Sequence, residues 1–166
     1  MENGIDFLKS QIDNAVAQHA VLLRSLRDNE ATAQDERYRD LCARHLPHMH
    51  EHQRMLEEYQ AKLGGASPGR AVRFINELAD APRESDFVRL IGDLLLSRQS
   101  EDTFKTFRDA GRTLGLSELA RIGEMAERHH DAYAQDANRL VQQMFVERAR
   151  GAEQIMRSMV DRPSAP

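Results

Sequence analysis

Helical periodicity in four long segments is the feature that most limits what this chain can fold into. Apolar side chains recur three or four residues apart over residues 4–29, 35–63, 86–115 and 118–159. That spacing puts them on one side of an α-helix, so each segment is predicted to be an amphipathic helix. The chain has no tryptophan, 5% aromatic residues and no run of alternating β-branched residues that would indicate a strand. The sequence therefore predicts an all-α protein.

The connections between the segments predict how the helices are arranged. Short loops join the first helix to the second and the third to the fourth, so each pair is antiparallel. Roughly twenty residues join the two pairs, and a short helix over 70–80 would let them run back along the bundle. This is the topology of the ferritin-like four-helix bundle. We expect one such domain over residues 1–160, a long crossover containing a short helix between helices two and three, and a disordered tail over 161–166.

Charge and composition argue against several classes of partner. The formal net charge is −4, whereas a nucleic-acid-binding protein would be expected to carry a basic face. No apolar stretch approaches the length of a membrane span, and the N-terminus lacks the apolar core of a secretory signal. The single cysteine, Cys42, excludes an internal disulfide and is typical of a reducing compartment. We therefore expect a cytoplasmic protein with no nucleic-acid or membrane partner.

Four of the seven histidines lie in "RHLPHMHEHQRM", residues 44–55, within the second predicted helix. On a helical wheel, His50 points to solvent, away from the apolar stripe that contains Leu41 and Leu56. The other three share the face of that stripe and are predicted to point inward. They are His45, His48 and His52.

The other helices bring ionisable side chains to a similar height along the bundle. His19 lies within the apolar stripe of the first helix, and Glu101 continues that of the third. On the fourth helix, His129 and His130 flank the centre of the stripe on either side, and Glu127 sits at its edge. Buried polar groups are unfavourable unless they are paired or coordinated, so this layer needs an explanation. The candidate metal ligands are His19, His45, His48, His52, Glu101, Glu127 and His130.

Three interpretations of this layer remain open from the sequence. Imidazoles bind zinc, copper, iron and nickel, and carboxylates add oxygen ligands, so the ion expected is iron, zinc or manganese. The spacings Glu127-x-x-His130 and His48-x-x-x-His52 put two side chains on one helical face, where each pair could grip one ion. The same residues could instead form a hydrogen-bonded polar layer, or a protonatable cluster that responds to pH.

Four segments carry a family resemblance over nearly the whole chain. They are "FLKSQIDNAVAQHAVLLRSL", "HLPHMHEHQRMLEEYQAKLGG", "FKTFRDAGRTLG" and "LARIGEMAERHHDAYAQDANRL". In these segments the chain resembles the YciF/YciE-like family of ferritin-like bacterial stress proteins. The resemblance implies a four-helix bundle that forms a homodimer, a role in stress responses and a metal centre.

Carried over residue by residue, the resemblance implies an altered ligand set. Glutamates of the family's first and second helices fall on His19 and His48, so two carboxylates become imidazoles. A Glu-His pair of its third helix falls on Ser97 and Arg98, which cannot replace those ligands. An oxygen-activating di-iron centre is therefore not expected. We expect either a mononuclear histidine-rich site or a non-catalytic bundle that has lost its metal and acts by dimerisation or partner binding.

Overall fold

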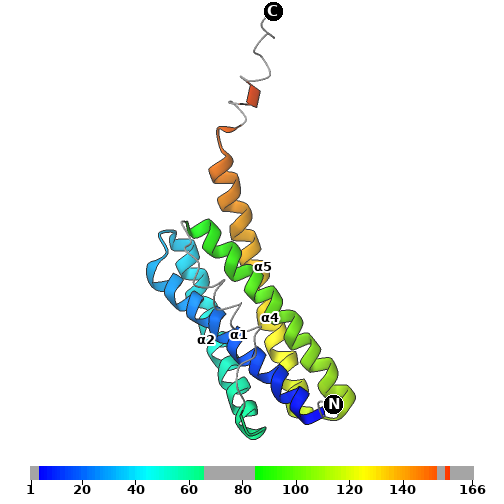
Figure 1. The fold of residues 1–166 in the computed structure, drawn as a ribbon. Coiled ribbons are helices and arrows are strands. Elements are labelled where there is room, and N and C mark those ends of the chain that lie inside the picture. The colour runs from blue at the N-terminus through cyan, green and yellow to red at the C-terminus, as the bar shows by residue number, and fades with distance from the viewer. Residues whose placement is uncertain (1–3, 66–84, 153–155, 158–166) are drawn as a thin grey trace, which may run out of the picture.

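The computed structural model describes residues 4–65, 85–152 and 156–157, and four long helices among them form a bundle (Figure 1). The helices are α1 (Gly4–Thr32), α2 (Glu36–Lys62), α4 (Asp86–Leu114) and α5 (Ser117–Ala149). The described residues contain no strand, which confirms the all-α prediction. None of these four helices is long and apolar enough to cross a membrane. The predicted helix over 70–80 and the predicted tail over 161–166 lie outside the described residues.

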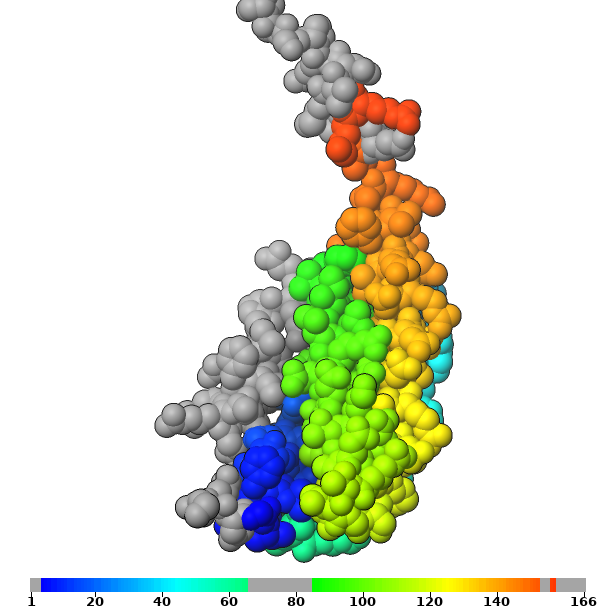
Figure 2. Space-filling model, turned by 90° about the vertical axis from the view of Figure 1, so that its right-hand side faces the viewer, coloured from blue at the N-terminus to red at the C-terminus, as the bar shows by residue number. Residues whose placement is uncertain are grey.

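The four helices pack around a common centre. α1 contacts α2 and α4, and α5 contacts the same two helices from the opposite corner. Figure 2 shows α4 (green) and α5 (yellow to orange) side by side, with the end of α5 reaching past the other helices. The bundle thus has four edges, α1–α2, α2–α5, α5–α4 and α4–α1, and residues from all four helices can meet inside it.

Local signals account for most of the helix ends. The side chains of Asp35 and Ser85 accept hydrogen bonds from backbone amides in the first turns of α2 and α4, as N-caps do. α5 begins at Ser117 without such a cap, because Leu116 is the N-cap residue and no side chain caps this helix. α5 ends at Ala149 rather than near residue 159, because Gly151 adopts a left-handed φ of 91° just beyond it.

Buried side chains follow an alternating three-and-four spacing through the helices. We call such a row of buried side chains along one helix its seam. In α2 the seam has seven residues, none of them more than 7% exposed. They are Tyr38, Cys42, His45, Met49, His52, Leu56 and Tyr59. The seam of α4 has the same spacing and consists of Leu90, Asp93, Ser97, Ser100, Phe104, Phe107 and Gly111. This is the a/d pattern of coiled-coil-like bundles, in which each seam side chain inserts between residues of a neighbouring helix.

A polar layer divides the apolar core into two clusters. One cluster surrounds Leu26 and Leu140 towards the α1–α2 loop, and the other surrounds Ile12 and Leu119 towards the α4–α5 loop. Between them every helix places polar residues on the seam. They are His19, His52, Ser97, Ser100 and His130. The middle layer predicted from the sequence is therefore present, although its membership differs.

Candidate metal centre

Three histidines from three helices meet in this middle layer. His19, His52 and His130 are at most 1% exposed, which confirms that they point inward. One ring nitrogen of each lies within 4.8 Å of one from each of the other two. Phe104 of α4 closes the remaining side, with its ring centroid 5.3–5.9 Å from those of the three imidazoles. The histidines thus form a compact cluster with an aromatic wall.

A glutamine fixes the tautomer of His19. Oε1 of Gln53 lies 2.9 Å from Nδ1 of His19. The amide nitrogen of the same glutamine donates to the Glu57 carboxylate at 2.7 Å and to the Val16 carbonyl oxygen at 3.3 Å. An amide oxygen can only accept, so the hydrogen-bond network assigns the proton of His19 to Nδ1. Its Nε2 therefore carries a bare lone pair.

The other two rings are also held by one nitrogen each. Nε2 of His52 lies 2.8 Å from Nδ1 of His129. Nδ1 of His130 lies 3.0 Å from Oγ of Ser97, whose hydroxyl donates to the His130 carbonyl oxygen at 3.4 Å. Because the Ser97 hydroxyl is already donating, Nδ1 of His130 is the donor to Oγ, and Nε2 of His130 keeps its lone pair. His52 keeps a lone pair on Nδ1 in the tautomer that donates from Nε2 to His129.

The second nitrogen of each ring is buried and has no hydrogen-bond partner among the described residues. These atoms are Nε2 of His19, Nδ1 of His52 and Nε2 of His130. Leaving a buried polar atom unpaired costs about 1–3 kcal/mol, so native proteins rarely do it. One water has two hydrogens and cannot donate to three lone pairs at once. A single metal ion can accept all three, and outer hydrogen bonds like those described above orient such ligands.

Burial keeps the three imidazoles in the form that binds metal. Burial lowers the pKa of His19 to about 4. Burial, together with neighbouring histidines, lowers the pKa of His52 to about 2 and holds that of His130 well below its usual value. All three rings are therefore neutral at pH 7, so no proton competes with an ion.

His45 and His48 lie beside the cluster and not in it. His45 is a buried seam residue whose Nε2 lies 3.0 Å from Oδ2 of Asp136. His48 is exposed, so the prediction that it lies on the core face is wrong. The wheel put both histidines on one face, but the seam runs from His45 through Met49 to His52 and leaves His48 at its side.

The candidate glutamates are paired with arginines. Glu101 accepts a hydrogen bond from Arg98 at 2.5 Å, and Glu127 pairs with Arg108. Both carboxylates are partly exposed and neither joins the three imidazoles. Of the predicted pairs Glu127-x-x-His130 and His48-x-x-x-His52, only His130 and His52 therefore belong to the group of three. In the part of the chain that the structure describes, the three histidines are the only group of three or more ligand side chains close enough to hold one ion.

A second polar centre inside the bundle was not predicted from the sequence. Asp93 is fully buried, and its carboxylate accepts hydrogen bonds from three side chains. The Tyr38 hydroxyl donates at 2.5 Å, the Asn29 amide at 2.8 Å and the Ser25 hydroxyl at 2.5 Å. This network joins α1, α2 and α4 about one turn of α4 away from Ser97.

Polar residues at seam positions explain why the predicted stripe of α4 differs from the buried one. The predicted stripe ran through Leu94 and Glu101, which are only partly buried. The seam instead passes through Asp93 and Ser97, whose polarity hides the periodicity. Counting back from Phe104 in steps of four and three would have found both residues.

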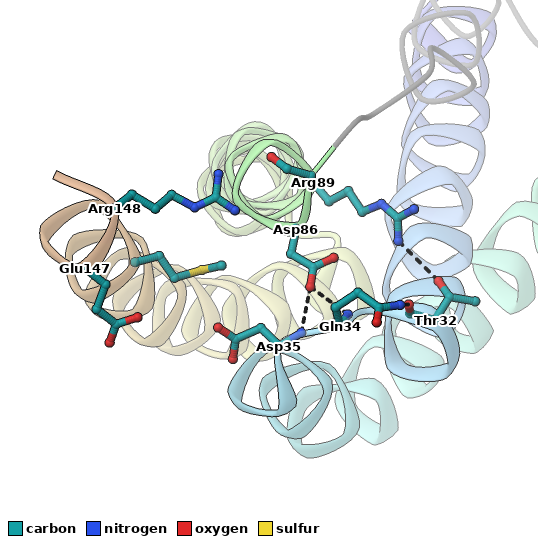
Figure 3. A pocket seen from close by; sticks show the side chains of 9 residues that line it. Thr32, Gln34, Asp35, Asp86, Arg89, Glu147 and Arg148 are labelled. Atoms are coloured by element: carbon teal, nitrogen blue, oxygen red, sulfur yellow. Dashed lines mark hydrogen bonds between the residues drawn. The ribbon is translucent and has the colours of Figure 1, made fainter. Parts of the chain in front are cut away.

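A pocket at the end of the bundle is separate from the histidine cluster (Figure 3). It has a volume of about 520 Å³ and lies where the α1–α2 loop meets the start of α4. The Asp86 carboxylate accepts hydrogen bonds from the backbone nitrogens of Gln34 and Asp35, both at 2.7 Å. Arg89 donates to the Thr32 hydroxyl at 3.3 Å. These contacts hold the α1–α2 loop against the first turn of α4.

Comparisons with known proteins support the fold. No protein-family model matches the sequence, and no curated protein matches it. Among solved structures, the chain is similar to a ferritin-like, diiron-carboxylate protein from Bacillus anthracis str. Ames, with a TM-score of 0.69 and 16% identity. The similarity covers 85% of this chain and 99% of that one. It confirms the ferritin-like four-helix bundle, whereas membership of the YciF/YciE family stays a prediction.

The residues present do not fit a di-iron carboxylate centre. Such a centre takes a glutamate from each of two helices and a Glu-x-x-His motif from each of the other two. Here the inward positions of α1, α2 and α5 are imidazoles, and α4 contributes Ser97 and Phe104. Three neutral nitrogen donors without a carboxylate fit one ion that prefers nitrogen ligands.

Proposed function

We propose that this chain is a ferritin-like metal-binding protein that holds one transition-metal ion through His19, His52 and His130. Two observations carry this proposal: each of the three rings has one buried nitrogen without a hydrogen-bond partner among the described residues, and one nitrogen of each ring lies within 4.8 Å of one from each of the other two. A purely structural polar layer would pair all of its ring nitrogens within the protein. Here one nitrogen of each ring is hydrogen-bonded and the other is not.

The donor set narrows the choice of ion. Imidazole nitrogens suit zinc, iron, copper and nickel, whereas manganese prefers oxygen ligands. Of the three ions expected from the sequence, zinc and iron therefore fit better than manganese. Three protein ligands leave a coordination position open, and an ion held in this way supplies Lewis-acid or, for iron or copper, redox chemistry to a small molecule. Phe104 and the two apolar clusters keep bulk water from the site.

A second candidate function is a non-catalytic bundle that acts as a homodimer. Phe145 and Val146, which are 61% and 58% exposed, favour it. Both lie in the C-terminal part of α5. The stress-response role implied by the YciF/YciE resemblance and the cytoplasmic location expected from the single cysteine are compatible with either function.

Elemental analysis of protein purified without a histidine tag distinguishes the two functions. We expect about one zinc or iron ion per chain, and its loss from the variants His52→Ala and His130→Ala. The variant His50→Ala is the control, because His50 is an exposed residue of the same helix and should leave metal content unchanged. Metal-free wild-type protein whose stability is unaffected by added zinc or iron would rule out the metal site.

A further inference from the structure

An exposed histidine lies next to the buried cluster and has no part in it. The ring of His48 lies 4.0 Å, centroid to centroid, from the ring of His129. His129 is partly buried, and its ring stacks on that of His52 at 5.0 Å. Its Nδ1 lies 2.8 Å from Nε2 of His52. Imidazoles thus form a continuous line from the surface to one ligand of the buried site.

The buried cluster needs a route to solvent if it binds an ion. Its three ligands are at most 1% exposed, so an ion must pass between helices to reach them. The α4–α5 edge is closed by tight packing of Gly123 against the α4 backbone and by the Arg108–Glu127 ion pair. The α2–α5 edge instead carries the line of His48, His129 and His52.

We infer that His48 and His129 form a second, surface metal site that captures a divalent transition-metal ion and passes it to the buried histidines. The inference rests on the proposed function of the buried cluster. His48 of α2 offers an incoming ion one nitrogen, and His129 of α5 offers Nδ1, which exchanges its hydrogen bond from His52 for the ion before the ion loses its last waters. The exposed side chain of His48 is free to turn towards an ion, and His129 contacts both His48 and His52.

A site of transit has a kinetic signature that differs from that of a final ligand. The surface site lowers the free-energy barrier that the ion crosses between solvent and the buried site. The same barrier is crossed on entry and on exit, so both rates change by the same factor. The equilibrium constant of the buried site does not change, because neither its ligands nor their hydrogen bonds are altered. Loss of a final ligand would instead weaken equilibrium binding.

Stopped-flow absorbance with Co²⁺ on the full-length, untagged, metal-free protein tests this signature. We compare the wild type with His48→Ala and with His48→Phe, which keeps a ring against His129 but lacks a nitrogen. Both variants should load and release Co²⁺ about tenfold more slowly, with the dissociation constant unchanged. The matched control is His50→Ala, whose rates should equal those of the wild type.

The outcomes separate this inference from the proposed function. Wild-type loading rates in His48→Ala would overturn the inference while leaving the buried site intact. Wild-type rates in His48→Phe would also overturn it, because ring packing and not a ligand nitrogen would then be what matters. A weaker equilibrium affinity in His48→Ala would contradict a transit role. Absence of Co²⁺ binding in the wild type would overturn the buried site itself and the inference with it.

Discussion

Oε1 of Gln53 lies 2.9 Å from Nδ1 of His19, and this contact determines which nitrogen of His19 faces the centre of the bundle. The glutamine oxygen must accept from His19, because the amide nitrogen donates to Glu57 and to the Val16 carbonyl oxygen, which fixes the orientation of the amide group. A side chain outside the cluster thus fixes the tautomer of one of its ligands, His19. Such outer hydrogen bonds typically change metal affinity by about 10–100-fold.

We therefore predict that Gln53→Ala weakens zinc binding by about 10–100-fold without unfolding the protein. The substitution removes the acceptor that holds the proton on Nδ1 of His19, so Nε2 is no longer reserved for the ion. Competitive titration against a zinc indicator measures the affinity. Gln99→Ala, at an exposed position on α4, is the control. Equal zinc affinities in the wild type and Gln53→Ala would show that the contact is not functional.

The buried histidines also predict how stability depends on pH in the metal-free protein. The pKa of His19 falls to about 4 and that of His52 to about 2 in the folded state, from a usual value of 6.5. Below pH 6.5 the unfolded chain therefore binds more protons than the folded one. Stability should be constant above this pH and should fall by about 1.4 kcal/mol per pH unit for each histidine as the pH drops towards 4.

Urea unfolding at pH 7.5, 6.0 and 5.0, with a chelator present, measures this dependence. His19→Leu removes one of the groups that resist protonation, so its stability should fall less steeply between pH 6.0 and 5.0. Parallel pH profiles for the wild type and His19→Leu would mean that His19 does not titrate differently in the folded and unfolded states.

Asp93 should be important for stability rather than for metal binding. Replacing it with alanine leaves the Tyr38 hydroxyl and the Asn29 amide without their buried acceptor. We expect Asp93→Ala to lower the free energy of unfolding by about 3 kcal/mol, measured by urea denaturation. The control is Asp102→Ala, at an exposed position on the same helix. A comparable loss in both variants would argue against a special role for the buried network.

Close packing of α4 on α5 predicts an unusual effect of alanine at a helical glycine. A Cβ atom on Gly123 would lie 2.5 Å from the carbonyl oxygen of Phe104 and would also meet the backbone nitrogen of Arg108. Alanine favours a helix over glycine by about 1 kcal/mol, yet we expect Gly123→Ala to lower the melting temperature because overpacking costs about 1–3 kcal/mol. Gly4→Ala, where a Cβ would meet nothing within 4 Å, is the control. A higher melting temperature for Gly123→Ala would show that the helices separate easily.

Helical spacing was enough to predict the bundle and the inward direction of three histidines. His19, His52 and His130 each interrupt an apolar stripe, so the periodicity on either side of them locates their faces. The wheel failed at His48 because it assigns an angle to each residue but does not show whether the seam passes through His48 or Met49. Only packing against the neighbouring helices decides between them.

The outer hydrogen bonds could not be predicted from the sequence for a different reason. Ser97 and Asp93 are polar residues at seam positions, and a reading based on apolar periodicity assigns such residues to the surface. Gln53 and His129 contact the cluster from the sides of their helices. The apolar periodicity does not indicate whether a residue at such a position points towards the core. Their roles depend on contacts between helices that are distant in the sequence.

Crystals grown with Zn²⁺ and measured on both sides of the zinc absorption edge test the central claim most directly. We predict an anomalous peak bonded to Nε2 of His19, Nδ1 of His52 and Nε2 of His130 at about 2.0–2.1 Å. A map with no peak among these three nitrogens, or with zinc held only by carboxylates such as Glu101 and Glu127, would contradict it.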